Sequence, residues 1–180
     1  MRFVVGPIDE GAAWEVAGWV YGGAYAAYNC PAGEADDFVG GILEPGNHYY
    51  AVRHGMGALV GYCCFGPDAR VPGGEYTEVA EPGERAGDLD DGFLDVGLGL
   101  RPDLTGRGLG GAFLEAIAGF AAGQLGHRRL RVTVAAWNRR AIRLYEKAGF
   151  RASHVFTRET PGGVANGSAE WVQMVRTGFD

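Results

Sequence analysis

The sequence predicts a single α+β domain in which helices flank one β-sheet. Its 180 residues are enough for one hydrophobic core and too few for two domains of ordinary size. Apolar residues make up 47% of the chain and charged residues 21%, which is close to the average for globular proteins. Strand-like and helix-like segments follow one another along the chain without an internal repeat. We therefore expect residues 1–180 to form one domain.

The first half of the chain combines one strand, two helices and a hairpin. Residues 2–5 are strand-like, and a helical pattern begins at about Ile8. Four aromatic side chains then recur at spacings of seven, four and three: Trp14, Tyr21, Tyr25 and Tyr28. These spacings predict one helix face, unless Gly22 and Gly23 interrupt the helix. A short second helix and the two strands of a hairpin complete this half: residues 34–44, 47–54 and 57–66.

Residues 67–92 form an insertion that is rich in glycine, proline and acidic side chains. A loop of this length inside a compact domain is usually functional or disordered. After the insertion, two strand–helix pairs and a final pair of strands are expected: residues 93–100, 106–125, 130–137, 138–149, 150–159 and 168–177. Asn138 is a good N-cap for the second of these helices, and Gly149 stands where a left-handed C-cap is needed.

Charge is divided unevenly along the chain, although the net charge is only −6. Residues 1–100 carry 4 basic and 16 acidic side chains, whereas residues 101–151 carry 10 basic and 3 acidic ones. Ordinary surface solvation would explain this division. It also fits a polyanionic ligand on the later segment and a cationic ligand on the earlier one. No nucleic-acid-binding motif accompanies the basic segment, so we do not expect nucleic acid as a partner.

The sequence gives no indication of a membrane segment, an export signal or a metal site. It lacks the run of about 18 apolar residues that a transmembrane helix needs, and its N-terminus lacks the apolar region of a signal peptide. The three cysteines, Cys30, Cys63 and Cys64, fit reduced thiols, and the four histidines show no metal-ligand spacing. We expect a cytoplasmic protein without a metal, and fifteen arginines against one lysine favour a bacterial source.

The stretch RPDLTGRGLGGAF, residues 101–113, places four glycines immediately before an amphipathic helical pattern. Gly106, Gly108 and Gly111 satisfy the GxGxxG pattern of dinucleotide-binding sites. However, residues 101–105 separate them from the strand, and no acidic residue follows about 20 positions later to bind a ribose. A P-loop is excluded because no Gly-Lys-Ser/Thr sequence is present. Backbone N–H groups at the start of the helix remain available to a diphosphate.

The glycine loop is followed by a second motif, AAWNRRAIRLYEKAGF, in residues 135–150. This motif has an Asn that opens a helix, a Tyr seven residues later and a closing Gly-Phe. Together with the glycine loop, it resembles the GNAT superfamily of acyl-coenzyme A N-acyltransferases, whose cofactor loop reads Gln/Arg-x-x-Gly-x-Gly/Ala. Thr105, Gly108 and Gly110 stand at the three defined positions of that loop, so the first position departs from the consensus.

The resemblance implies a fold, a cofactor and a set of binding residues. The fold is an α/β/α sandwich with a mixed, mostly antiparallel sheet of about six to seven strands, flanked by about four helices. The cofactor is acetyl-CoA, with its diphosphate on the loop and its pantetheine arm along a strand that splays from residues 133–136. Glycine inside that strand, at Gly97 and Gly99, fits a close approach by a ligand. The residues implied for the cofactor are Leu98, Gly99, Leu100, Gly106, Arg107, Gly108, Leu109, Gly110, Gly111, Asn138 and Tyr145.

The resemblance also implies two catalytic groups. Tyr145 would be the general acid that protonates the leaving thiolate, since an ordinary tyrosine pKa of about 10 keeps it protonated at neutral pH. Its alternative role is that of a core aromatic. Asp95 would be the general base that takes the proton of an ammonium group, directly or through water, with a solvated or capping role as the alternative. Thr133 stands where other members carry a catalytic Glu, and a backbone N–H near Leu98 would stabilise the oxyanion.

These features predict an N-acetyltransferase that moves the acetyl group of acetyl-CoA to a primary amine of a small molecule or peptide. The amine would attack directly in a ternary complex. The insertion and the four N-terminal aromatic residues are then expected on the acceptor side. A non-catalytic acyl-CoA sensor and an NAD- or FAD-dependent oxidoreductase are the alternatives. The final strand pair leaves an edge that could join a twofold partner, so a homodimer is also expected.

Overall fold

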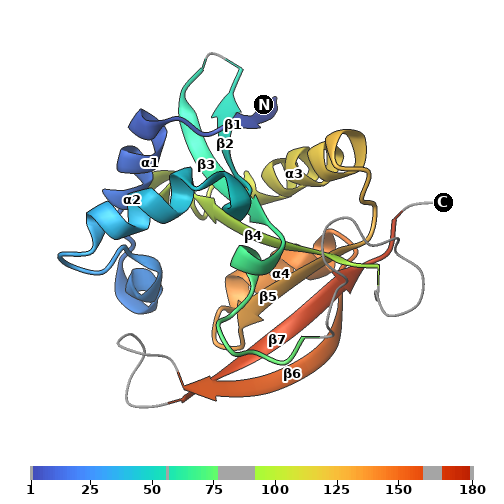
Figure 1. Cartoon of the computed structure of the whole chain (residues 1–180). Helices are drawn as coiled ribbons and strands as arrows, with labels where there is room; N and C mark the ends of the chain where they lie inside the picture. Colours follow the sequence, from blue (N-terminus) through green and yellow to red (C-terminus); the bar gives the residue numbers. More distant parts are fainter. Residues whose placement is uncertain (1, 56, 77–91, 160–167, 179–180) are drawn as a thin grey trace.

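The computed structural model describes residues 2–55, 57–76, 92–159 and 168–178. Its strands form one sheet in the order β1-β2-β3-β4-β5-β7-β6 (Figure 1). The strands are β1 (Phe3–Pro7), β2 (Tyr49–His54), β3 (Leu59–Phe65), β4 (Leu94–Leu100), β5 (Leu130–Ala135), β6 (Arg151–Glu159) and β7 (Ser168–Arg176). The helices are α1 (Glu10–Ala17), α2 (Ala35–Leu43), α3 (Gly110–Gln124) and α4 (Arg139–Lys147), with 3-10 turns η1 (Gly23–Tyr28), η2 (Pro45–Asn47), η3 (Pro67–Ala69) and η4 (Pro102–Leu104).

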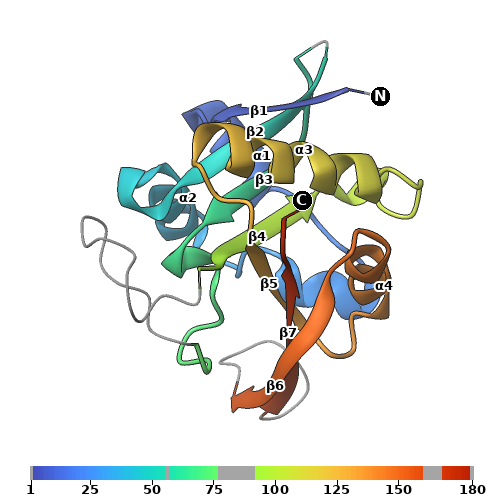
Figure 2. The same ribbon diagram turned by 90° about the vertical axis from the view of Figure 1, so that its right-hand side faces the viewer.

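Two helices cover each face of the sheet. α1 and α2 pack against β2 and β3 on one face, where Ala13 and Ala51 belong to a small core (Figure 1). α3 and α4 pack on the other face, where Ile117 and Tyr145 belong to the larger core (Figure 2). Neighbouring strands are antiparallel except β4 and β5, which are parallel. The α/β/α sandwich with a mixed, mostly antiparallel sheet is therefore confirmed. No helix in the described ranges is long and apolar enough to cross a membrane.

The aromatic residues of the N-terminal segment do not share one helix face, so that prediction is wrong. α1 ends at Ala17, and the next helical residues belong to the separate turn η1. Gly18 is the C-cap of α1, residues 19–22 are not helical, and Gly23 begins η1 with a φ of 60°, a backbone conformation that only glycine adopts at little cost. Trp14 stays on α1, where 43% of its surface is exposed. The three tyrosines instead border a cavity at the middle of the sheet: Tyr21, Tyr25 and Tyr28.

β4 and β5 separate after a short parallel stretch. Two residue pairs join them, Leu94 with Leu130 and Asp95 with Arg131. Beyond these pairs, β4 continues along β3, and β5 continues along β7. One edge of β4 therefore has no strand partner from residue 96 onward, which confirms the predicted splay and opens a fork in the sheet.

Candidate active site

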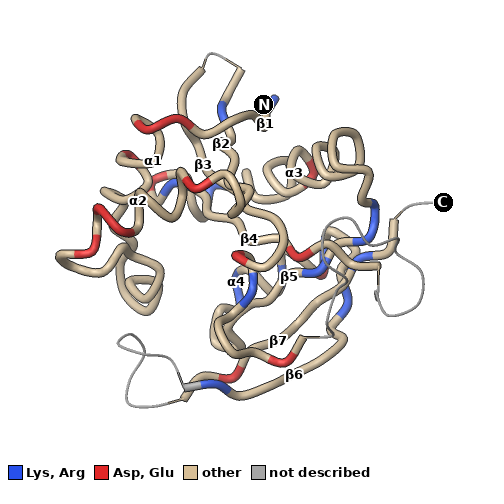
Figure 3. Tube along the Cα trace, viewed as in Figure 1, with Lys and Arg blue, Asp and Glu red and all other residues tan. Residues whose placement is uncertain are grey.

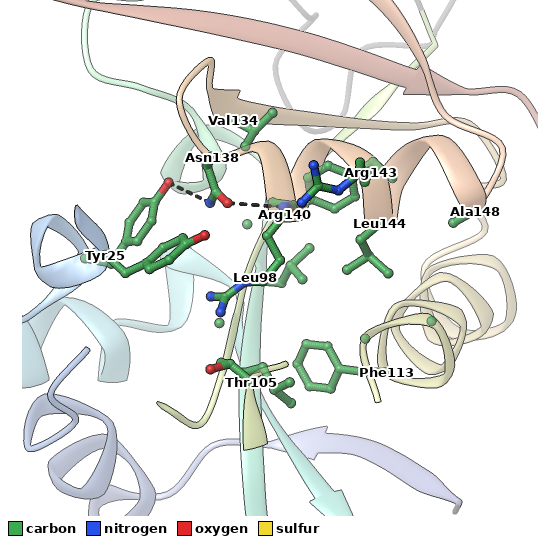
Figure 4. A pocket seen from close by; sticks show the side chains of 18 of the residues that line it. Tyr25, Leu98, Thr105, Phe113, Val134, Asn138, Arg140, Arg143, Leu144 and Ala148 are labelled. Atoms are coloured by element: carbon green, nitrogen blue, oxygen red, sulfur yellow. Dashed lines mark hydrogen bonds between the residues drawn. The ribbon is translucent and has the colours of Figure 1, made fainter. Parts of the chain in front are cut away.

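A cavity of about 710 Å³ lies where β4 and β5 separate (Figure 4). It is bordered by β4, the loop before α3, α4 and η1. Nine of the predicted cofactor residues line it: Leu98, Gly99, Leu100, Gly106, Gly108, Gly110, Gly111, Asn138 and Tyr145. Arg107 and Leu109 belong to the same loop but are not among the lining residues. The fold thus brings the two sequence motifs to the same hollow.

Glycine is needed in the loop for two different reasons. Gly106 and Gly108 have φ values of 75° and 77°, which lie in the left-handed region. Gly110 begins α3 against α4, where an added Cβ would meet Leu144 Cδ2 at 2.9 Å. No side chain caps α3, so its first backbone N–H groups remain available to an anion. The helix predicted from residue 106 therefore begins later, because residues 106–109 form the loop itself.

Replacing Gly108 by alanine is expected to weaken acetyl-CoA binding and to destabilise the fold by roughly 1–2 kcal/mol, because alanine resists the left-handed backbone. Gly119 is a matched control, since it lies inside α3 with no atom within 4 Å of an added Cβ. Gly119→Ala should stabilise the protein by about 0.5–1 kcal/mol. Urea unfolding and calorimetric titration with coenzyme A measure both effects. An unchanged Kd in Gly108→Ala would contradict a binding role for the loop.

Asn138 links the start of α4 to η1. Its Oδ1 accepts a hydrogen bond from the Ala141 N–H at 3.1 Å, as predicted for an N-cap. Its Nδ2 donates to the hydroxyl of Tyr28, also at 3.1 Å (Figure 4). The side chain is buried and borders the cavity. The capping role is therefore confirmed, and a contact between Asn138 and a cofactor stays a prediction.

Tyr145 faces the cavity from α4 and is only 7% exposed. Its ring also packs against Phe150, with the two ring centroids 5.7 Å apart. Burial raises the pKa of the Tyr145 hydroxyl well above its ordinary value, and the nearby Tyr28 adds to this shift. The hydroxyl is therefore a proton donor throughout the physiological pH range. The ring packs in the core and also borders the cavity, and its role as general acid stays a prediction.

Asp95 does not reach the cavity. It is 3% exposed, and its carboxylate accepts hydrogen bonds from Arg131 at 2.6 and 2.8 Å and from Arg70 at 2.7 Å. Tyr76 covers this cluster, with its ring centroid 5.0 Å from the guanidinium carbon of Arg70 and 5.4 Å from that of Arg131. Both carboxylate oxygens are engaged in buried ion pairs. The geometry therefore gives no support to Asp95 as a general base.

Four tyrosines line the end of the cavity next to η1: Tyr21, Tyr25, Tyr28 and Tyr62. The Tyr21 hydroxyl donates to the carbonyl oxygen of Leu100 at 2.9 Å, which ties this end to the last residue of β4. Burial raises the pKa of Tyr21 to about 12, so it stays protonated. Three of the four aromatic residues predicted for the acceptor side thus line the cavity, and their contact with an acceptor stays a prediction. Of the acidic insertion, residues 77–91 lie outside the described ranges.

Sequence reasoning predicted a polyanionic ligand on the basic residues 101–151 but did not name the cations that line the cavity. Arg140, Arg143 and Lys147 line it from α4, and Glu115 is the only carboxylate among the described lining residues. The Arg140 guanidinium lies 4.1 Å from the ring centroid of Tyr25 (Figure 4). The helical spacing of the three cations was the signal that could have found them, since positions three and four apart are neighbours on a helix. In Figure 3, acidic residues gather on α1 and α2, away from α4.

Comparison with known proteins gives one family and one fold. The model described as the Acetyltransferase (GNAT) family matches residues 14–150. A GNAT-family acetyltransferase from Bacillus anthracis is 16% identical, with a TM-score of 0.65 over 98% of this chain and 95% of that chain. AAC(6')-Ib in complex with ribostamycin and coenzyme A is 20% identical, with a TM-score of 0.67 over 98% and 94%. A chimera of the spermidine N-acetyltransferase SpeG from Vibrio cholerae and hSSAT is 12% identical, with a TM-score of 0.65 over 98% and 96%. No curated protein matches the sequence.

These comparisons agree with the geometry of the cavity. At 20% identity or less, the solved structures establish a shared fold, and the family follows from the sequence model, which covers most of the chain. The two motifs that resemble this family meet at the fork between β4 and β5. The chain therefore belongs to the GNAT family of acetyltransferases.

Proposed function

We propose that the protein transfers the acetyl group of acetyl-CoA to a primary amine of a small molecule or peptide, by direct attack of the amine in a ternary complex. The fork in the sheet carries this proposal, because the glycine loop, the free edge of β4 and Tyr145 all border its cavity. The names of two structural neighbours support an amine as acceptor, since one binds the aminoglycoside ribostamycin and the other is a spermidine N-acetyltransferase.

The residues around the fork fit acetyl-CoA. The N–H groups at the start of α3 suit its diphosphate, and the free edge of residues 98–100 can pair with the pantetheine amides as an added strand would. The hydroxyl of Thr105 donates to the carbonyl oxygen of Pro102 at 2.8 Å, so Thr105 is already engaged. The cations of α4, with Arg140 foremost, are therefore our candidates for the side-chain contact to phosphate.

Each group at the fork has its own role in the proposed acetyl transfer. Acetyl-CoA supplies an acetyl group that is activated as a thioester. The amine nitrogen forms a bond to the carbonyl carbon, the carbon–sulfur bond breaks, and Tyr145 donates its proton to the sulfur. The backbone N–H near Leu98 stabilises the negative charge on the carbonyl oxygen. Asp95 is engaged in buried ion pairs, so we propose that water accepts the proton lost by the amine. A proton from water can later restore the Tyr145 hydroxyl.

We also propose that the protein is a cytoplasmic, bacterial enzyme that forms homodimers. Three free cysteines, of which Cys63 and Cys64 are buried, support a reducing compartment. The excess of arginine over lysine supports a bacterial source. β6 lies at the edge of the sheet and offers a strand edge that a second copy could extend.

Thermal unfolding with candidate ligands tests the cofactor. A ligand that binds only the native state adds about 2.7 kcal/mol of stability at 100 times its Kd. We expect acetyl-CoA to raise the unfolding midpoint, and NAD and FAD to leave it unchanged. Thiol release with a panel of primary amines then tests the reaction. Protection by NAD or FAD alone would favour the oxidoreductase, and acetyl-CoA binding without turnover of any amine would favour the sensor.

A further inference from the structure

β5 carries a hydroxyl group at the point where the sheet opens. The last residue pair between β4 and β5 joins Asp95 to Arg131, and Thr133 is the next residue of β5 on the same face. Thr133 lines the cavity, as do Leu98 of β4 and Tyr145 of α4. Thr133 therefore lies at the fork, where the proposed function puts the thioester.

Tyr76 fixes the orientation of this hydroxyl. The Tyr76 oxygen accepts a hydrogen bond from the Val71 N–H at 2.8 Å and donates to Thr133 Oγ1 at 3.0 Å. With the Val71 N–H bonded to its oxygen, the Tyr76 hydroxyl directs its one proton to Thr133 Oγ1. The Thr133 oxygen is then an acceptor toward Tyr76, and its own proton must point elsewhere. No described residue accepts that proton, although Thr133 borders the cavity.

Tyr76 itself is held in place. Its ring lies edge-on to Phe156, with centroids 5.9 Å apart, and the guanidinium groups of Arg70 and Arg131 lie over its ring. Burial raises the pKa of its hydroxyl, which keeps Tyr76 a donor. The Thr133 oxygen is thus held by Tyr76 before any ligand arrives, and such preorganisation is what stabilisation of a transition state requires.

We propose that the Thr133 hydroxyl donates a hydrogen bond to the thioester carbonyl oxygen as negative charge develops on it. Thr133 is then a catalytic residue alongside the backbone N–H of β4, and Tyr76 is a positioning residue that acts through Thr133. No bond of Thr133 is made or broken in this role, because the hydroxyl keeps its proton. The inference rests on the proposed function, since it needs an acetyl thioester in the fork.

Three substitutions test the proposal. Thr133→Val keeps the branched shape and removes the hydroxyl, and it should lower kcat by about 10²-fold. Thr133→Ser keeps the hydroxyl and should retain most of the activity. Tyr76→Phe should lower kcat less than Thr133→Val, because the Thr133 hydroxyl remains but loses its fixed orientation. The Kd for acetyl-CoA, measured by calorimetry, should stay close to the wild-type value in all three variants, and KM for the amine should change little.

The outcomes separate this proposal from the proposed function. Full activity in Thr133→Val would overturn the donor role of Thr133 while leaving the acetyltransferase intact. Equal loss in Thr133→Ser and Thr133→Val would also overturn it, because shape and not the hydroxyl would then matter. A wild-type protein that binds acetyl-CoA and acetylates no amine would instead overturn the proposed function, together with this inference. Unfolding midpoints of all variants show whether a loss of activity reflects a loss of folded protein.

Discussion

Replacing Tyr145 by phenylalanine is expected to lower kcat by about 10²- to 10⁴-fold, because the sulfur must then leave without a proton donor. The Kd for acetyl-CoA and the free energy of unfolding should change little. Phenylalanine keeps the ring that packs on Phe150, and no described residue forms a hydrogen bond with the Tyr145 hydroxyl. Single-turnover measurements of thiol release, with calorimetry for the cofactor, check the two expectations separately.

The pH dependence of the same reaction provides a second check. Burial raises the pKa of Tyr145 well above its ordinary value of about 10. The Tyr145 hydroxyl therefore keeps its proton at every pH below about 10. The wild-type rate should therefore show no alkaline decline from this group up to about pH 10. An unchanged kcat in Tyr145→Phe would mean that the hydroxyl is not the general acid and that Tyr145 serves only to pack the core. An alkaline decline near neutral pH that disappears in Tyr145→Phe would contradict the protonated state described here.

The two motifs that border the fork were predictable because their requirements are local, whereas the splay of the two strands was implied by the resemblance to the GNAT superfamily. A helix that begins without a capping side chain, preceded by glycines in left-handed conformations, is visible in residues 105–111 of the sequence. The Asn that opens α4 and the Tyr seven residues later are likewise set by helical geometry, which places both on the side that faces the cavity. These features depend on short stretches of chain, so the sequence alone was sufficient to indicate them.

The glycines of β4 were predicted correctly as sites of close approach, but the neighbour is different. We expected a ligand against Gly97 and Gly99. In the structure, an added Cβ at Gly97 would meet Cys64 Sγ at 2.7 Å, and one at Gly99 would collide with the ring of Tyr62. Side chains of β3 therefore require these glycines, whether or not a ligand lies along the free edge of β4.

Features that depend on distant parts of the chain were not predictable. Tyr21, Tyr25 and Tyr28 had helical spacing, yet α1 ends at Ala17. Tyr21 instead reaches the cavity through its contact with β4, and Tyr28 through its contact with Asn138. The charge division suggested a polyanionic ligand on residues 101–151, and three cations of that segment do line the cavity, but only the fold shows which ones. The acidic acceptor side that it also suggested falls largely on residues 77–91, outside the described ranges. Asp95 had the expected place on its strand, but its partners Arg70 and Arg131 come from segments 25 and 36 residues away.

Replacing Asp95 by asparagine is expected to destabilise the fold by about 3–5 kcal/mol, because it breaks a buried ion pair by removing one partner. Asp95 and Arg131 are each 3% exposed, and the carboxylate is shared by two guanidinium groups. Asparagine has nearly the same shape as aspartate, so the decrease in the free energy of unfolding reports what the negative charge and its hydrogen bonds contribute. Urea unfolding followed by tryptophan fluorescence gives the free energy. Asp103→Asn is the control, since that carboxylate forms an exposed pair with Arg101 at 2.7 Å and should cause no resolvable change.

The same variant distinguishes a structural Asp95 from a catalytic one. If Asp95 acts only through the fold, kcat per folded molecule should stay near the wild-type value at a temperature where Asp95→Asn is folded. If Asp95 is a general base, its loss should instead lower kcat by about 10²- to 10⁴-fold under those conditions, and high pH should relieve the loss because the amine is then already deprotonated.

Replacing both partners, as in Asp95→Leu with Arg131→Met, should recover part of the lost stability, because apolar side chains of similar volume remove the cost of burying the charges. A stable Asp95→Asn variant with greatly reduced kcat would show that Asp95 is a catalytic residue. Because Asp95 does not line the cavity, the fork would then have to change shape when the amine binds.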